Sequence, residues 1–161
     1  MENNDEQKIL QDAETALNTL GDCSVVYELI KPLLIKNNPA ALFLYSTFSV
    51  AGMETDDEFD IRRMELLNKS AESGYLPAIY ELAVCYDLGD LVEQDHTIAG
   101  GLYKKAAEAG YAKAKLSHGL NLFYGSHGMP KDKEFGLSLI KQAANENIDG
   151  AVDALKQLHN D

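Results

Sequence analysis

No stretch of this chain is apolar enough to cross a membrane, and few of its residues are basic. Its apolar runs fall short of the roughly 18 to 20 residues that a membrane helix needs, and Met1 to Asp12 is nearly all polar, unlike a secretory signal. The 14 lysine and arginine residues face 26 acidic ones, which gives a formal net charge of −12. Nucleic-acid binding depends on basic side chains that displace counterions, so this balance disfavours nucleic acid and anionic membranes as partners. The sequence predicts a soluble, cytoplasmic protein.

Cysteine and strand patterns are also scarce. The two cysteines, Cys23 and Cys85, lie far apart in apolar helical settings, so reduced and buried thiols are the expectation and a disulfide is the minority alternative. No segment alternates apolar and polar residues in the manner of a strand, whereas helical spacing is common. The prediction is an all-α fold.

One motif recurs at a spacing of 36 to 38 residues, with its clearest copy at residues 104–116 and others at 69–78 and 142–151. The same period is kept by alanines that open helices, by glycines that end them and by alanines in the partner helices: Ala40, Ala78, Ala114 and Ala151; Gly52, Gly89 and Gly125; Ala71, Ala107 and Ala144. Small side chains allow helix axes to approach closely. One helix pair cannot bury its apolar face alone, so successive pairs are expected to stack into a solenoid.

Helix start and stop signals predict about nine helices. Their expected ranges are residues 5–19, 23–36, 40–51, 59–73, 77–88, 95–109, 112–124, 132–145 and 149–159. Residues 1–36 are expected to form a divergent N-terminal pair and 149–161 a closing helix. Residues 37–148 between them form three helix pairs, at about 37–74, 75–110 and 111–148.

The repeat resembles the Sel-one-like repeat (SLR) family. That family's pattern joins an alanine-opened helix to a glycine-bearing loop, an Asp and the run Ala-Ala-Glu-x-Gly. The middle copy matches at Ala78, Leu82, Ala83, Tyr86, Gly89, Asp95, Ala99, Tyr103 and residues 106–110. The first copy departs from the pattern, with Phe59 in place of the Asp and Arg63 in place of a small residue. The resemblance covers about residues 22 to 159. It implies a right-handed α/α superhelix of antiparallel helix pairs, similar to tetratricopeptide proteins, whose first helices line a concave groove that binds proteins.

Within that resemblance, the non-core positions of the first helices are the candidate partner-binding residues. They are Leu42, Ser46, Tyr80, Val84, Asp87, Leu116, Leu120, Phe123 and Tyr124. An apolar and aromatic stripe with an acidic rim is typical of a protein interface. Packing against the neighbouring repeat is the equally weighted alternative for each of these residues.

No set of residues forms a catalytic, cofactor or metal motif. His118 stands where the repeat has leucine (Leu44, Leu82 and Leu155), and a hydrogen-bonded or groove-edge histidine is expected there, with a metal or acid–base role as the alternative. His127 has no ligand partner at a recognisable spacing, and His96 and His159 are expected to be exposed, so no metal site is predicted. The acidic segment 54–60 is expected to be a solvated loop rather than a cation site.

The leading functional hypothesis is therefore a non-catalytic protein-binding solenoid without a cofactor. Its sharper form is a bacterial immunity protein that occludes a basic toxin or effector, because an acidic protein gains association rate with a basic partner. The alternative is an adapter or scaffold in a signalling or assembly complex. A hydrolase, resting on His118 and on a few family members with hydrolytic activity, is a minor alternative. The sequence leaves open whether the chain is a monomer or a dimer, and whether the groove, the convex face or the acidic segment is the interface.

Overall fold

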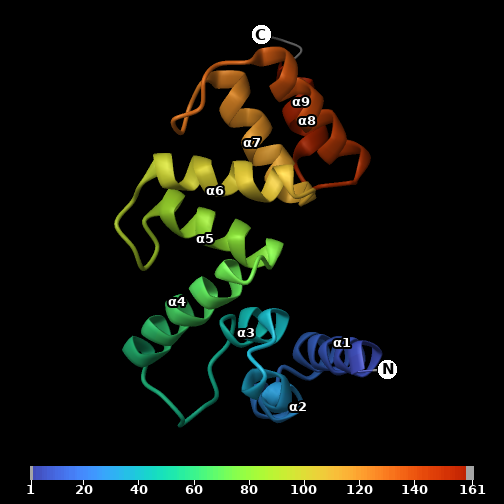
Figure 1. Cartoon of the computed structure of the whole chain (residues 1–161), viewed down its shortest axis with the longest axis vertical. Helices are drawn as coiled ribbons and strands as arrows, with labels where there is room; N and C mark the ends of the chain where they lie inside the picture. The colour runs from blue at the N-terminus through green and yellow to red at the C-terminus, as the bar shows by residue number, and fades with distance from the viewer. Residues whose placement is uncertain (1, 159–161) are drawn as a thin grey trace. The chain divides into compact units, whose positions relative to one another are not determined.

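The computed structural model describes residues 2–158, with side chains from residue 4 onward, and this part of the chain contains helices and loops but no strand (Figure 1). The helices are α1 (Glu2–Leu20), α2 (Cys23–Ile35), α3 (Pro39–Tyr45), α4 (Asp56–Glu72), α5 (Leu76–Leu88), α6 (His96–Glu108), α7 (Ala112–Tyr124), α8 (Lys133–Asn145) and α9 (Ala151–Leu158). The predicted all-α class is confirmed. No helix in the described range is long and apolar enough to span a bilayer.

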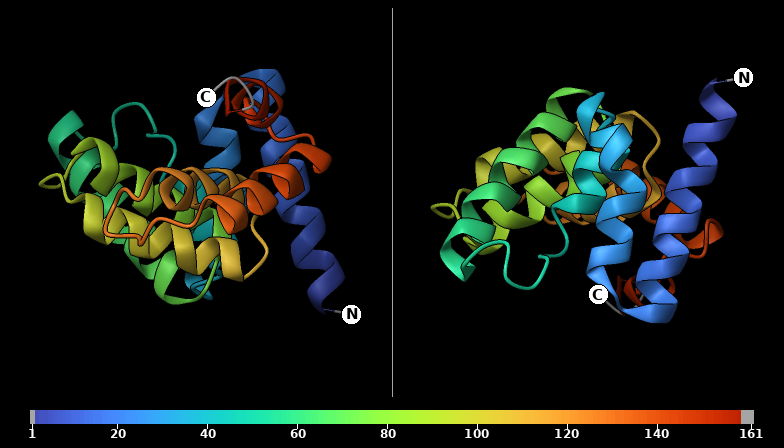
Figure 2. Two further views of the ribbon diagram at one scale, coloured as in Figure 1. Left: turned by 90° about the horizontal axis from the view of Figure 1, so that it is seen from above. Right: turned by 90° about the horizontal axis from the view of Figure 1, so that it is seen from below.

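The chain divides into two compact units, and the division falls in the first turn of α5, between Ala78 and Ile79. In the first unit α1 lies beside α2, as both views in Figure 2 show, and α3 packs on α4. The core of this unit includes Val26, Ile30 and Leu33 of α2, all essentially buried. The proline inside α2 does not end the helix, which runs through position 32 to Ile35.

In the second unit α6, α7, α8 and α9 pack one against the next, and the contact between α7 and α8 is the most extensive. Two glycines make that contact close. A Cβ built on Gly136 of α8 would lie 2.6 Å from the carbonyl oxygen of Gly119 on α7, and one on Gly119 would lie 2.8 Å from Ile140 Cγ1. The helices therefore touch backbone to backbone, which only glycine allows at these two positions.

Most helix boundaries follow from local capping. The carboxylates of Asp95 and Asp132 accept hydrogen bonds from backbone N–H groups in the first turns of α6 and α8, so each residue is an N-cap and each helix begins one residue later than predicted. The α7 helix has the predicted bounds and ends at Gly125, whose φ of +72° lies in the left-handed region that favours glycine.

The boundaries of α3 and α4 differ from the prediction. The α3 helix ends at Tyr45 rather than at residue 51, because the hydroxyls of Ser46 and Thr47 donate to the carbonyls of Phe43 and Leu44. The α4 helix begins at Asp56 rather than at residue 59, because a capping box satisfies its first N–H groups: Glu58 N–H donates to the Thr55 hydroxyl, and Thr55 N–H donates to the Glu58 carboxylate.

A single arginine fixes the loop between α3 and α4. The Arg62 guanidinium on α4 donates to the carbonyl oxygens of Tyr45 (2.7 Å) and Phe48 (3.0 Å) and forms a two-point ion pair with Glu54. It also lies over the Tyr45 ring, 3.8 Å from the ring centroid. These contacts satisfy carbonyls that a longer α3 helix would have used, and they explain why the loop is ordered around buried Phe48.

At the helix contacts the residue before each predicted alanine is fully buried, and the predicted Ala71 and Ala107 are buried as well. Ala106 on α6 and Ala143 on α8 are fully buried, and Ala144 is half-buried. Ser70 holds the matching place in α4, where its hydroxyl donates to the carbonyl of Pro39 at 2.7 Å. Ser70, Ala106 and Ala143 are therefore buried at these helix contacts, together with the predicted Ala71 and Ala107.

Candidate functional site

The predicted partner-binding residues divide into buried and accessible groups. Leu42, Ser46 and Phe123 are buried. The Ser46 hydroxyl is used on the Phe43 carbonyl, and Phe123 packs in a core with Ile140 and Leu158. Because these three side chains expose almost no surface, they are unavailable to a partner in this structure.

The accessible residues lie at matching positions of two successive helix pairs. Tyr80 and Val84 on α5 are half-buried, and so are Leu116 and Leu120, which lie 36 residues further along on α7. One more helical turn gives a third pair, Leu88 and Tyr124, which are 71% and 54% exposed. Residues four apart share one face of a helix. We call these six residues the apolar stripe.

Leu88 was not among the residues predicted from the sequence. The signal for it was the repeat period itself, since Leu88 lies 36 residues before Tyr124. At the other end of the apolar stripe, the Tyr80 ring contacts the rings of Tyr103 and Tyr111, each 5.5 Å away between centroids. Tyr111 is the N-cap of α7, so an aromatic contact links the start of α5 to the start of α7.

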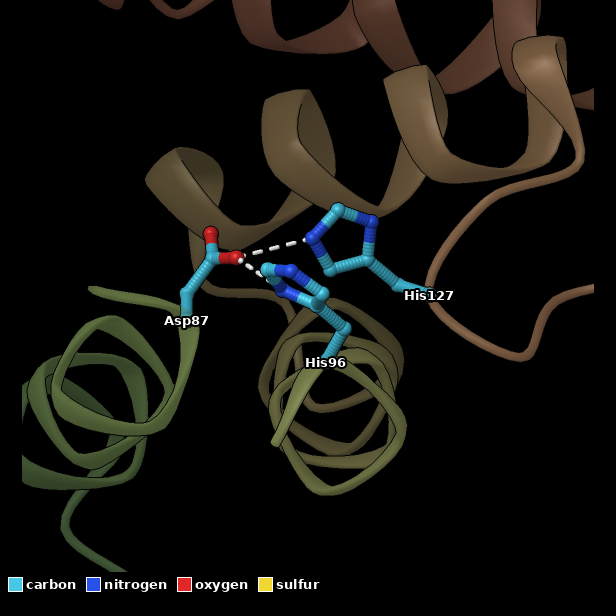
Figure 3. Close-up of side chains that lie close together, drawn as sticks. All are labelled: Asp87, His96 and His127. Atoms are coloured by element: carbon cyan, nitrogen blue, oxygen red, sulfur yellow. Dashed lines mark hydrogen bonds and ion pairs between the residues drawn. The ribbon is translucent and has the colours of Figure 1, made fainter. Parts of the chain in front are cut away.

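Asp87, the remaining predicted residue, directly precedes Leu88 in α5 and belongs to a polar cluster with His96 and His127 (Figure 3). Its Oδ1 atom lies 2.8 Å from Nε2 of His127 and 3.1 Å from Nδ1 of His96. The two imidazole rings meet edge to face, with centroids 4.8 Å apart. The other oxygen, Oδ2, accepts a hydrogen bond of 3.2 Å from the Tyr103 hydroxyl. Asp87 therefore joins three segments: the end of α5, the start of α6 and the loop after α7.

The cluster favours an ionised aspartate. Burial opposes the charge of Asp87, but hydrogen bonds from His127, His96 and Tyr103 outweigh it and hold the pKa of the carboxyl below its usual value. Burial and then the Asp87 charge raise the pKa of Tyr103, so its hydroxyl stays protonated and donates. At neutral pH the cluster thus presents a carboxylate between two imidazoles.

A close backbone contact brings His127 to this position. Gly100 of α6 faces the loop, and a Cβ at that residue would overlap the carbonyl oxygen of His127. His127 itself has a φ of +54°, and the next residue, Gly128, has a φ of +70°. His127 has no ligand partner at a recognisable spacing in the sequence, and the fold brings it to Asp87 across 40 residues. A glycine inside a helix indicates close approach of another segment, and Gly100 was the available signal.

His118 is buried in α7 at the position that leucine occupies in other repeats. Burial lowers the pKa of its imidazole, so the ring is neutral at pH 7. Its Nδ1 atom has no hydrogen-bond partner among the described residues. The residue lies outside the one group of three metal-ligating side chains found in residues 2–158, which is Asp87, His96 and His127. His118, the residue on which the hydrolase hypothesis rests, is therefore not accessible to a substrate in this structure.

The acidic segment 54–60 is largely helical rather than a loop. Asp56, Asp57 and Glu58 form the exposed first turn of α4, where the partial positive charge of a helix N-terminus favours acidic side chains. Glu54 is paired with Arg62. His96 is exposed, as predicted, and His159 lies outside the described residues.

The sequence profile of the Sel1 repeat matches residues 76–111 and 112–148, which are the helix pairs α5–α6 and α7–α8. Residues 76–148 of the chain therefore consist of two Sel1 repeats. The two matched repeats carry both the apolar stripe and the Asp87 cluster. Sel1-repeat proteins are generally protein–protein interaction scaffolds, and their fold is typically non-catalytic.

Solved structures with this repeat are similar to the chain. A Sel1 repeat protein from Oxalobacter formigenes is similar with a TM-score of 0.71 and 26% identity, over 83% of this chain and 38% of that one. The protein c5321, a protective antigen present in uropathogenic Escherichia coli strains that displays an SLR fold, has a TM-score of 0.66 and 28% identity, over 77% of this chain and 26% of that one. Cysteine rich protein B of Helicobacter pylori shares the fold at 16% identity and a TM-score of 0.55, over 90% of this chain and 96% of that one.

A curated relative, chitin synthase regulatory factor 3 of Schizosaccharomyces pombe, is 28% identical over 120 residues. The alignment covers 74% of this chain but 13% of that protein. This chain thus spans a minor part of the curated relative and of the first two structures.

Proposed function

We propose that this chain binds another protein through the apolar stripe on α5 and α7. The observation that carries the proposal is the repetition of partly exposed apolar side chains at equivalent positions of two successive repeats. Packing of the second unit does not require Leu88 or Tyr124 to be apolar, because both side chains are mostly in solvent. Large apolar and aromatic side chains of this kind supply much of the binding energy in protein interfaces.

The finer form of the proposal is an immunity protein that neutralises a basic toxin or effector. The support for this form is the excess of acidic residues in the chain. Residues 1–78 contain 14 of the 26 acidic residues and six of the 14 basic ones, so the acidic excess is concentrated in the first unit. An acidic surface of this kind accelerates association with a basic partner, and salt reduces the effect. The adapter alternative needs no charge complementarity, so the salt dependence of the association rate distinguishes the two.

The test of the apolar stripe replaces its two most exposed members. Leu88→Ala with Tyr124→Ala is expected to weaken partner binding at least tenfold, which corresponds to about 1.4 kcal/mol. The melting temperature should change little, because neither side chain is buried. Phe135→Ala on α8 is the matched control, since this ring is 51% exposed but lies outside the apolar stripe. Equal affinities for the double variant and the wild type would refute the proposal.

The immunity form has its own test. The product of a neighbouring gene should bind the chain in a pulldown at low salt, and its association rate should fall steeply as salt is raised. Failure to bind at low salt and high concentration contradicts the immunity form. Binding with a salt-independent association rate favours the adapter form.

A further inference from the structure

We propose that Asp87, His96 and His127 form a binding site for a divalent transition-metal ion of the Zn²⁺ class. One ligand atom from each residue lies within 4.8 Å of the other two (Figure 3). Two imidazole nitrogens and one carboxylate oxygen are a ligand set that suits Zn²⁺ and neighbouring divalent metals. This site is independent of the proposed partner surface and could exist without it.

Two of the three distances between ligand atoms are close to those around a coordinated ion, and the third pair, from the two histidines, lies within 4.8 Å. Bonds from Zn²⁺ to nitrogen and oxygen are about 2.0 to 2.2 Å, so neighbouring ligand atoms in a tetrahedral site are roughly 3.3 Å apart. Asp87 Oδ1 already lies 2.8 Å from Nε2 of His127 and 3.1 Å from Nδ1 of His96. His96 is the first residue of α6 and its side chain is 53% exposed, so it has room to turn toward an ion. Closure therefore needs side-chain rotation rather than movement of a helix.

The surroundings hold the ligands in place. The Tyr103 hydroxyl binds Oδ2 of Asp87 and leaves Oδ1 directed at the two imidazoles. Such outer contacts orient the ligands of metal sites and raise affinity. Asp87 lies in the last turn of α5, where the helix dipole favours a cation, and its carboxylate supplies one negative charge. Gly100 fixes the loop that carries His127.

Three protein ligands leave a fourth coordination position for water or for a side chain of another protein. An ion at this site would join α5 and α6 of one Sel1 repeat to the loop between α7 and α8 of the next. Its direct consequence would be a more stable second unit, because an ion that binds only the folded chain shifts the unfolding equilibrium.

The experiment is a calorimetric titration of the full chain with Zn²⁺, after treatment with a chelator, in excess Mg²⁺ to saturate surface carboxylates. The expected result is one Zn²⁺ ion per chain and a higher melting temperature with the metal present. His127→Gln and His96→Gln should each weaken binding at least tenfold, and Co²⁺ should give the visible absorption of a coordinated ion in the wild type alone. Wild-type protein that does not bind Zn²⁺, or histidine variants that bind it as tightly as the wild type, would overturn the proposal.

Substitutions at two adjacent glycines, Gly100 and Gly101, test the geometry of the site without changing a ligand. Gly100→Ala introduces a Cβ that overlaps the His127 carbonyl, so it should displace the loop and weaken Zn²⁺ binding at least tenfold. Gly101→Ala lies next to it on the same helix and has no neighbour within 4 Å, so it should bind Zn²⁺ as the wild type does. Circular dichroism checks that both variants are folded. Equal affinities for the two folded variants contradict the proposed geometry, and if Gly100→Ala does not fold, the two histidine variants decide.

Discussion

The close contact between α7 and α8 gives a quantitative prediction, for the substitution Gly136→Ala. A Cβ at this position would lie 2.6 Å from the carbonyl oxygen of Gly119 and 2.8 Å from the backbone nitrogen of Phe123. Both obstacles are backbone atoms of α7, so no side chain can rotate out of the way. An ordinary contact of 3.4 Å would require α7 and α8 to separate by roughly 0.8 Å. Overpacking of this kind typically costs about 1 to 3 kcal/mol.

The matched control is Gly101→Ala on α6. A Cβ at position 101 would have no other atom within 4 Å, and the residue is exposed. The gain in helix propensity from Gly to Ala, about 0.5 to 1 kcal/mol, is common to both variants. The difference between them therefore isolates the cost of the close contact.

The assay is urea unfolding followed by circular dichroism. Gly136→Ala is expected to be about 1 to 3 kcal/mol less stable than Gly101→Ala, and Gly101→Ala slightly more stable than the wild type. At roughly 2 to 4 °C per kcal/mol for a chain of this size, the melting temperatures of the two variants should also separate clearly. Equal stabilities would refute the backbone contact between α7 and α8.

Three further substitutions test other parts of the structure. Arg62→Lys keeps the charge but loses the fork that binds two carbonyls and Glu54, so it should cost about 2 kcal/mol in chemical unfolding, and an unchanged stability would contradict the described loop. Ala106→Leu should cost about 1 to 3 kcal/mol because the site is fully buried, and a melting temperature equal to that of the wild type would argue against that contact. His118→Leu should flatten the pH dependence of stability between pH 7 and 5. Burial lowers the pKa of His118, so below about pH 6.5 the unfolded chain gains a proton that the folded chain does not. The stability of the wild type therefore decreases as the pH is lowered. Parallel pH profiles for this variant and the wild type would contradict the assignment.

Helix bounds that depend on neighbouring residues were predicted to within one residue at the starts of α6 and α8 and at the end of α7, although the local capping box that starts α4 was missed. Asp95 and Asp132 act on N–H groups within three residues of themselves, and Gly125 needs only its own left-handed conformation. The early end of α3 depends on more than local signals. The Ser46 and Thr47 hydroxyls bind carbonyls of its last turn, but Arg62 of α4 binds the carbonyls of Tyr45 and Phe48, and that contact could not be predicted.

In the candidate site, too, the features set by spacing along a helix could be predicted, and the contacts between distant segments could not. Helical spacing grouped Leu116, Leu120 and Tyr124 on one face of α7. It could not show that Phe123, one residue away from Tyr124, lies in a core with Ile140, or that Leu116 and Leu120 pack partly against that core. The contact between Asp87 and His127 spans 40 residues, and it depends on the absence of a side chain at Gly100. No spacing of ligands along the chain signals such a contact.

The central claim, that the apolar stripe binds a protein, is tested most directly by site-specific cross-linking in the cells that produce the chain. A photoreactive amino acid would replace Tyr124 in one variant and Phe135 in another, since both rings are about half exposed and lie in the same unit. The account predicts that position 124 forms a cross-link to one defined protein, that position 135 does not, and that Leu88→Ala reduces the cross-link. Equal labelling from both positions, or no cross-link from position 124 while position 135 gives one, would contradict it.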